Sequence, residues 1–220
     1  MNGYSFTLAG AELTALPSGA LFWADQSCLT VSDLHLGRSE RFARRAGALL
    51  PPYEIDETLT RLDSDIAGTG ARMVICLGDT FDDLQAAGLS EPHQLWLTRL
   101  MAGRRWIWIE GNHDPGPVHM GGENHAELPL GPLIFRHIAT PDASGEVSGH
   151  YHPKARIAGQ SRRCFVTDRQ RVIVPAYGAY TGGLATEAQV LSDLMAPNAL
   201  AILTGTTCRP MPMPRRSEHR

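Results

Sequence analysis

Runs of apolar residues that stop abruptly at polar side chains recur along this chain. The run from Trp106 to Ile109 is aromatic and β-branched, which is typical of a strand buried on both faces, and it is followed by Gly111-Asn112-His113-Asp114. Runs at 29–32 and 73–77 end in the same way, at Asp33-Leu34-His35 and at Gly78-Asp79. Each of these patterns predicts a strand that delivers polar groups into a loop.

Helical spacing separates these strands. Ile55, Leu59, Leu62 and Ile66 predict an amphipathic helix over about 55–67 that ends at Gly68, and Ser90 begins a second helix whose apolar part is 95–100. We expect a further helix over 38–47, ended by the prolines at 51–52. The alternation of strand and helix predicts an α/β domain.

The rest of the chain follows different patterns. Residues 4–30 predict two or three strands joined by tight turns, whereas the Gly- and Pro-rich stretch Pro115 to Gly131 predicts a long loop that forms a lid or rim. Further strands are expected at 133–135, 146–148 and 199–203, a hairpin at 164–174, and a helix near 187–195. We expect one domain over 1–207, and a disordered tail over 208–220.

Composition narrows the functional classes. With 220 residues the chain suits a single well-buried core, and its net charge of -3 argues against indiscriminate nucleic-acid binding through the whole surface while leaving a local basic patch open. The four cysteines are widely separated, which indicates buried free thiols. No apolar run approaches membrane-spanning length and residues 1–10 lack a signal-peptide pattern, so we expect a cytoplasmic protein. A homo-oligomer is compatible with this composition.

Metal-binding side chains gather at five strand-to-loop junctions. Because loops at the carboxyl ends of strands in open α/β sheets meet at one crevice, we expect these junctions to converge. Residues two apart in an extended segment point to the same side, so each Asp-x-His or His-x-His pair can present two groups together. Four imidazoles, two carboxylates and one amide suit two five- or six-coordinate ions rather than one tetrahedral ion. The residues are Asp33, His35, Asp79, Asn112, His137, His150 and His152.

These motifs, in this order, resemble the five-motif signature of the calcineurin-like metallophosphoesterases. More narrowly, the chain is similar to the bacterial ligase-associated DNA-damage-response phosphoesterases and endonucleases over roughly residues 30–184. The segments that carry this narrower likeness are Asp33-Leu34-His35-Leu36-Gly37, Phe42-Ala43-Arg44-Arg45, Leu50-Pro51-Pro52-Tyr53-Glu54, Gly149-His150-Tyr151-His152-Pro153 and Pro175-Ala176-Tyr177-Gly178-Ala179-Tyr180-Thr181-Gly182-Gly183.

The resemblance implies a four-layer α/β/β/α sandwich with two mixed sheets. It also implies one metal held by Asp33, His35, Asp79 and His152, and another held by Asp79, Asn112, His137 and His150. His113 would be the catalytic histidine and Asp114 its partner. Two departures from the family pattern stand out: Thr80-Phe81-Asp82-Asp83 occupies the place where many relatives carry a histidine, and Arg136 rather than glycine precedes His137.

The implied chemistry is hydrolysis of phosphodiester bonds. Two divalent ions activate water as a nucleophile and neutralise phosphoryl oxygens, and His113 could protonate the leaving oxygen. Manganese is the first expectation, with iron and zinc suiting the same ligands. By resemblance the substrate is DNA and the partners are a ligase, a helicase and an exonuclease-like protein. Two alternatives stay open: a phosphomonoesterase or nucleotide hydrolase acting on a small metabolite, and an inactive repair-complex scaffold.

Several side chains have two interpretations. Arg38, Arg41, Arg44 and Arg45 form either a solvated helix face or phosphate contacts beside the site. Tyr177 and Tyr180 either close a hairpin corner or flank the cleft and stack on a base or sugar. Simpler structural roles are predicted for the remaining aromatic and imidazole groups: Trp106 and Trp108 in the core, and His93, His119 and His125 as solvated or structural residues.

Overall fold

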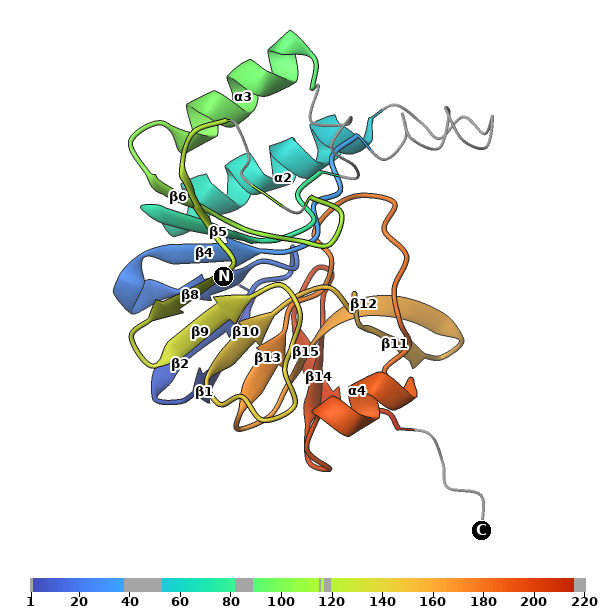
Figure 1. Cartoon of the computed structure of the whole chain (residues 1–220). Helices are drawn as coiled ribbons and strands as arrows, with labels where there is room; N and C mark the ends of the chain where they lie inside the picture. The colour runs from blue at the N-terminus through green and yellow to red at the C-terminus, as the bar shows by residue number, and fades with distance from the viewer. Residues whose placement is uncertain (1, 38–52, 82–88, 115, 117–119, 216–220) are drawn as a thin grey trace.

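In the computed structural model, two β-sheets pack face to face, with helices on both outer faces (Figure 1). The structure describes residues 2–37, 53–81, 89–114, 116 and 120–215. Helices α2 (Glu54–Thr69) and α3 (Glu91–Met101) cover the first sheet, and the short helix α4 (Gln189–Leu194) covers part of the second. The four layers that the resemblance implies are therefore present.

The first sheet is mixed. Its strands follow the order of the sequence, antiparallel from β1 to β4 and parallel from β4 to β7. The bounds are β1 Tyr4–Leu8, β2 Ala11–Ala15, β3 Leu21–Trp23, β4 Cys28–Val31, β5 Met73–Leu77, β6 Arg105–Ile109 and β7 Glu123–His125, with a 3₁₀ turn η1 at Ala24–Gln26. The parallel half ends at the edge where the polar motifs begin, because β4, β5 and β6 all run in one direction.

The second sheet is also mixed, in the order β15-β14-β12-β13-β10-β9-β8. Strands β9, β10 and β13 run parallel, and their neighbours run antiparallel. The bounds are β8 Glu127–Leu130, β9 Leu133–Arg136, β10 Glu146–Ser148, β12 Gln160–Thr167, β13 Arg171–Ile173, β14 Leu200–Leu203 and β15 Arg209–Pro212. Strand β11 (Lys154–Ile157) pairs with the first half of β12, and its first residue also forms an isolated parallel bridge to Ala185.

The core consists of successive apolar layers because neighbouring residues of each strand face opposite sides. In β5, Ile75 and Leu77 pack between the sheets, whereas Val74 and Cys76 pack against the helices. Trp106 and Trp108 share the helix-facing side of β6 and are 2% and 1% exposed, which confirms their prediction as core residues. All four cysteines are free and buried, as predicted.

The predicted helices and strands are present, with shifted ends. Helix α2 runs past Gly68 to Thr69, and Gly70 with φ +65° caps it, because glycine adopts the left-handed conformation without a steric penalty. Ser90 precedes α3, as expected. The helix expected over 38–47 lies outside the described residues. None of the helices in the described part of the chain is both long and apolar enough to cross a membrane.

Two predictions are wrong. The stretch 115–131 contains β7 and β8 rather than a continuous loop, and the tail expected to be disordered contains β15, whose residues pair with β14. All three are short edge strands, two of them interrupted by proline. Such strands are fixed by the backbone of the neighbouring strand, so their sequences carry little β-propensity.

Candidate metal centre

Polar residues from both sheets meet at one edge of the molecule. Strands β4, β5 and β6 of the first sheet are followed by Asp33, Asp79 and Asn112, and strands β9 and β10 of the second by His137 and His150. The Nδ1 atom of His137 lies 2.7 Å from the Leu77 carbonyl oxygen at the end of β5, so the two sheet edges are in direct contact. The convergence expected from the sequence is therefore observed.

One group of potential metal ligands consists of Asp33, His35 and His152. Each contributes an atom, and these atoms lie within 4.8 Å of one another. The His152 Nε2 atom is 3.1 Å from Oδ1 of Asp33, and both Asp33 and His35 are buried. A carboxylate and two imidazoles at this separation can bind one divalent ion.

A second group contains Asp79, His137 and His150, again within 4.8 Å of one another. The Nε2 atom of His137 lies 3.4 Å from Oδ2 of Asp79 and 3.2 Å from Nδ1 of His150. It also lies 3.0 Å from Oδ1 of Asn112, so all four expected ligands of this group are together.

The hydrogen bond to Leu77 determines what the second group can bind. Because Nδ1 of His137 donates to a carbonyl, the neutral ring directs the lone pair of Nε2 towards Asp79, Asn112 and His150. Four lone-pair atoms then face one point in a mostly buried place, where unpaired acceptors are costly. A divalent cation at that point would satisfy all of them, so the donor set fits a metal ion such as manganese, iron or zinc.

Electrostatics keep both carboxylates ionised. Burial by itself raises the pKa of Asp79, but the hydrogen bond and charge of His137, the His113 backbone N–H and the charge of His35 lower it to about 2. Burial likewise raises the pKa of Asp33, and contacts with His152, His137 and Ser32 more than offset it and lower the pKa. Both groups therefore present anionic oxygens at neutral pH.

The pKa values of the two histidines in the second group shift in opposite directions. Burial lowers the pKa of His137, yet Asp79 and Asp33 raise it above its ordinary value. Burial and the charge of His137 lower the pKa of His150, which outweighs the effect of the same carboxylates. Without a metal, one positive charge on His137 thus partly replaces the cation that this group is suited to bind.

The ligand residues have an uncommon backbone conformation. Asp33, His35, Asp79, His150 and His152 all have φ between 46° and 68°, the left-handed region that non-glycine residues rarely adopt. Such conformations cost of order 1–3 kcal/mol each and persist where the surrounding structure fixes them, often at functional sites.

This conformation corrects one expectation. The i, i+2 pairs are not extended, and His150 and His152 do not act together: His150 belongs to the second group and His152 to the first. The resemblance had implied this division, whereas strand geometry had not.

Close backbone approach explains why glycines flank the site. A Cβ at Gly149 would lie 1.7 Å from Oγ of Ser32 and 2.7 Å from Oδ2 of Asp33, and a Cβ at Gly111 would lie 2.3 Å from Oδ1 of Asp79. Glycine is required at both positions because no other side chain fits without moving a ligand.

Asp114 positions the loop that carries Asp79. Its Oδ1 accepts the backbone N–H of Asp79 at 2.9 Å, and its Oδ2 accepts those of Thr80 and Phe81 at 2.8 and 3.2 Å. Burial raises the pKa of this carboxyl, and the charge of Asp79 adds to the effect although the backbone donors oppose it. Asp114 therefore acts on the loop of Asp79, and its role as partner of His113 stays a prediction.

Sequence reasoning missed several positioning groups. Ser32 donates to Oδ2 of Asp33 at 2.5 Å, and the backbone N–H groups of Tyr177 and Gly178 bind the carbonyls of Ser32 and Asp33. The serine directly before the Asp-x-His motif was a readable signal. The contact with 177–178 was not, because more than 140 positions separate the partners.

Of the two interpretations of Tyr177, the structure favours a structural corner over a ring that stacks on substrate. Its side chain is fully buried, its hydroxyl donates to Oδ2 of Asp65 at 2.8 Å, and the Arg61 guanidinium lies 4.7 Å from its ring centre. Tyr177 thus closes the corner between its loop and α2. Tyr180, by contrast, is 43% exposed, so a substrate contact there stays a prediction.

The other predicted residues fall into three classes. His113 is half-buried beside the site, with its ring centre 5.3 Å from that of His35 and its backbone N–H bound to Asp79. His93 bridges Ser90 and Asp56, and His125 lies 3.3 Å from Glu123, in agreement with structural roles. The remaining predicted residues lie outside the described part of the chain: Arg38, Arg41, Arg44, Arg45 and His119.

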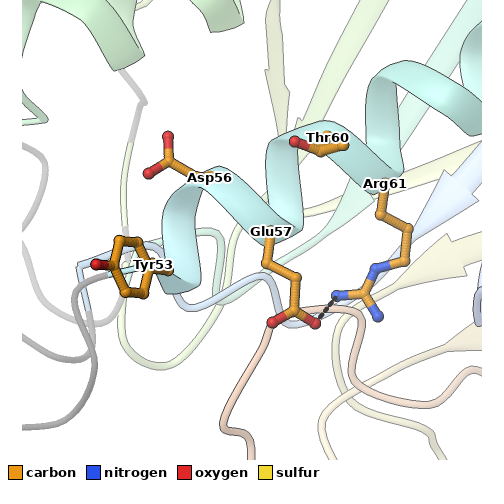
Figure 2. A pocket seen from close by; sticks show the side chains of 5 residues that line it. All are labelled: Tyr53, Asp56, Glu57, Thr60 and Arg61. Atoms are coloured by element: carbon orange, nitrogen blue, oxygen red, sulfur yellow. Dashed lines mark ion pairs between the residues drawn. The ribbon is translucent and has the colours of Figure 1, made fainter.

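A shallow surface depression of about 280 Å³ adjoins the second group. Its lining includes the ligand residues Asn112 and His137, together with Glu110 and the exposed Ile138. A molecule bound at this group would therefore have room on that side. Another depression, of about 480 Å³, lies along α2 between Tyr53 and Arg61 and contains none of the ligand residues (Figure 2).

Comparisons with known proteins place this geometry in a family. The sequence matches none of the curated proteins. Its fold is similar to the crystal structure of a Pseudomonas putida nuclease, MPE, with a TM-score of 0.75 and 25% identity over 95% of this chain and 100% of that one. Residues 28–183 match the model of the calcineurin-like phosphoesterases, a span that includes every ligand residue named above. The chain therefore belongs to the calcineurin-like phosphoesterase family and is a metal-dependent phosphoesterase.

Proposed function

We propose that this protein is a two-metal phosphodiesterase that cleaves DNA, as an endonuclease or end-processing enzyme in repair. The observation that carries the proposal is the pair of adjacent ligand groups, in which lone pairs from both sheets converge and the backbone N–H of His150 donates to Oδ2 of Asp33 in the other group at 2.9 Å. Divalent ions at those points supply activated water and neutralise phosphoryl oxygens. The family likeness supports phosphoester hydrolysis, and the narrower resemblance supports phosphodiester bonds as the bonds that are hydrolysed.

The proposed ligand sets follow the two groups. Asp33, His35 and His152 hold one ion, and Asn112, His137 and His150 hold the other. Asp79 is shared: its Oδ2 faces His137, while its Oδ1 accepts the His113 backbone N–H. Manganese is the proposed metal in the cell, with iron and zinc as alternatives.

His113 is proposed as the proton donor to the leaving oxygen. Its ring lies beside His35 and outside both ligand groups, so it is free of the geometric demands of metal binding. Proton transfer by a positioned imidazole contributes roughly 10²–10⁴-fold to a rate. We expect His113→Ala to keep both metals and to lose turnover by that factor. Loss of metal together with activity would contradict the role.

DNA is proposed as the substrate on two grounds. The solved protein of similar fold is described as a nuclease, and the narrower resemblance is to DNA-damage-response enzymes. Tyr180 offers an exposed aromatic ring on which a base can stack. By the same resemblance, a ligase, a helicase and an exonuclease-like protein are the proposed partners.

A small-molecule phosphatase is the competing proposal. The depression beside Asn112 and His137 has a volume of about 280 Å³, enough for a leaving group the size of a small metabolite. An inactive scaffold is disfavoured, because the sequence carries every ligand that the family motif requires.

One set of assays separates these proposals. The protein is loaded with Mn²⁺, Fe²⁺ or Zn²⁺, its metal content is measured, and turnover is followed on bis(p-nitrophenyl) phosphate, p-nitrophenyl phosphate, nucleotides and single- and double-stranded DNA. We expect cleavage of the diester and of DNA with Mn²⁺. Efficient nucleotide hydrolysis without DNA cleavage would favour the phosphatase, and no turnover with any loaded metal would favour the scaffold.

A further inference from the structure

A two-stranded ribbon leaves the second sheet next to the metal centre. Strand β11 pairs antiparallel with the first half of β12, from Lys154 opposite Arg163 to Ile157 opposite Gln160. In Figure 1 it extends sideways from the sheet, beneath the chain that leads from β13 to α4. The ribbon begins two residues after His152, so its base lies beside the first ligand group.

The ribbon is strongly cationic. From Glu146 to Asp168 the intervening chain carries Lys154, Arg156, Arg162 and Arg163 and no carboxylate, although the whole protein has a net charge of -3. Lys154 lies directly opposite Arg163, and like charges in this position destabilise a sheet. Four cations with no acidic residue between them favour the binding of a polyanion along the ribbon.

The inner cations attach the ribbon to the site. Nη2 of Arg163 donates to the Gly178 carbonyl at 2.7 Å, and Nζ of Lys154 donates to the Thr181 carbonyl at 3.1 Å. The same segment binds Asp33 through the backbone N–H of Gly178. The ribbon and the first ligand group are therefore parts of one connected structure.

One arginine of α2 lies near the base of the ribbon, although the helix itself is acidic. Burial lowers the pKa of the Arg163 guanidinium to about 10, and the charge of Arg61 adds to the effect while Glu57 opposes it. Arg61 projects from α2 with its guanidinium 3.9 Å from Glu57 (Figure 2). The ribbon's own cations, rather than those of α2, therefore carry the positive charge beside the first ligand group.

The outer cations are exposed. Arg156 follows Lys154 by two residues and so shares its face, whereas Arg162 lies on the opposite face. Within the described residues, neither arginine has a carboxylate partner at ion-pair distance. Their charges are consequently available to a bound molecule.

We propose that the β11–β12 ribbon binds the phosphate backbone of a nucleic-acid strand a few nucleotides away from the bond that is cleaved. The inference rests on the proposed phosphodiesterase function and adds a binding site to it. From Lys154 to Arg156 the extended strand β11 spans about 7 Å, which corresponds to about two nucleotides at about 3.4 Å per phosphate of a duplex strand. Arg156 is the main contact and Arg162 the lesser one.

The test compares substrates of different length in matched variants. Arg156→Ala/Arg162→Ala is compared with Arg72→Ala/Arg169→Ala, which removes the same charge from two exposed arginines at the far end of β5 and in the turn after β12. Steady-state kinetics with Mn²⁺ are measured on bis(p-nitrophenyl) phosphate, a dinucleotide and a twelve-nucleotide single strand. Binding of the long strand is measured against salt concentration.

For the ribbon variant we expect KM on the twelve-nucleotide strand to rise about 10-fold, with kcat retained and the salt slope of binding reduced by roughly 0.7 for each lost phosphate contact. Turnover of the dinucleotide and of bis(p-nitrophenyl) phosphate should equal that of the unmodified protein, and the control variant should match it on all substrates.

Three outcomes would overturn the inference. One is an unchanged KM and salt slope in the ribbon variant, with the small diester still hydrolysed; that result leaves the phosphodiesterase proposal intact. Another is equal losses on the dinucleotide and the long strand, which would indicate a general defect. The third is lost binding to phosphatidylglycerol vesicles with strand binding retained, which would assign the ribbon to a lipid surface. A protein inactive on every diester would instead refute the proposed function.

Discussion

Two buried polar clusters lie at opposite ends of strand β10. Glu146 begins the strand and is fully buried with Arg171, while His150 follows the end of the strand at the metal centre. In the Glu146 cluster the charges are opposite: Arg171 and Arg136 lie 3.7 Å from the carboxylate, and Thr140 donates to it through its backbone N–H and its hydroxyl. Arg171 in turn donates to the carbonyls of Thr140 and Pro141.

The metal centre has the opposite character. There the groups are mostly acceptors that face one another, with the buried Asp79, the half-buried His150 and the exposed Asn112 around Nε2 of the buried His137. The comparison teaches how to separate a structural cluster from a functional one. A buried cluster of opposite charges is largely neutralised within the protein, whereas one whose lone pairs converge suits a cation from outside.

The largest effect is expected from Asp79→Asn, which keeps an acceptor for the His113 N–H but removes the negative charge of the ligand that we propose both metals share. Turnover should fall on the order of 10³-fold, because charge stabilisation by the ions is worth several kcal/mol. Metal content, measured by elemental analysis, should fall with it. The melting temperature in EDTA should stay close to that of the unmodified protein. Full metal occupancy in the variant would contradict the role of this carboxylate as a metal ligand.

Glu146→Gln should act on stability alone. It leaves Arg171 buried without its counter-charge, which costs about 3–5 kcal/mol and lowers the melting temperature by roughly 6–20 °C. Metal content and turnover per folded molecule should be unchanged. A loss of bound metal in the folded variant would show that the two ends of β10 are coupled, contrary to this contrast.

Gly149→Ala should weaken metal binding without removing a ligand. The new Cβ would displace Ser32 or Asp33, and displacement of groups that orient ligands typically costs 10–100-fold in metal affinity. Gly68→Ala is the control, since no atom lies within 4 Å of a Cβ there. Titration of the apoprotein with Mn²⁺ measures both, and equal affinities would contradict the close packing.

The smallest effect is expected from Tyr177→Phe. Loss of the hydroxyl bond to Asp65 should cost about 1–3 kcal/mol of unfolding free energy, because the carboxylate loses a buried donor. Turnover on DNA should be unchanged, whereas Tyr180→Ala should raise KM if that exposed ring stacks on a base. A raised KM in the Tyr177 variant would restore its role in substrate binding.

Local sequence patterns predicted much of the fold. The continuous apolar runs at β5 and β6 and the helical spacing of α2 are visible because strands buried on both faces and amphipathic helices leave periodic signatures. Short edge strands such as β7, β8 and β15 leave none, since a partner's backbone fixes them. The same limit applies to β11, which lies off the main path of the second sheet and pairs with β12.

For the site, the sequence by itself determined the chemical inventory: carboxylates, imidazoles and an amide placed where strands end, because those residue types and that placement are local properties. Only the tertiary structure decided which groups share a point. The left-handed backbone angles place His150 and His152 in different ligand groups. The hydroxyl of the buried Tyr177 is bound by Asp65, which is 112 positions away in the sequence. Orientation and burial arise from contacts between distant segments, so they exist only once the chain has packed.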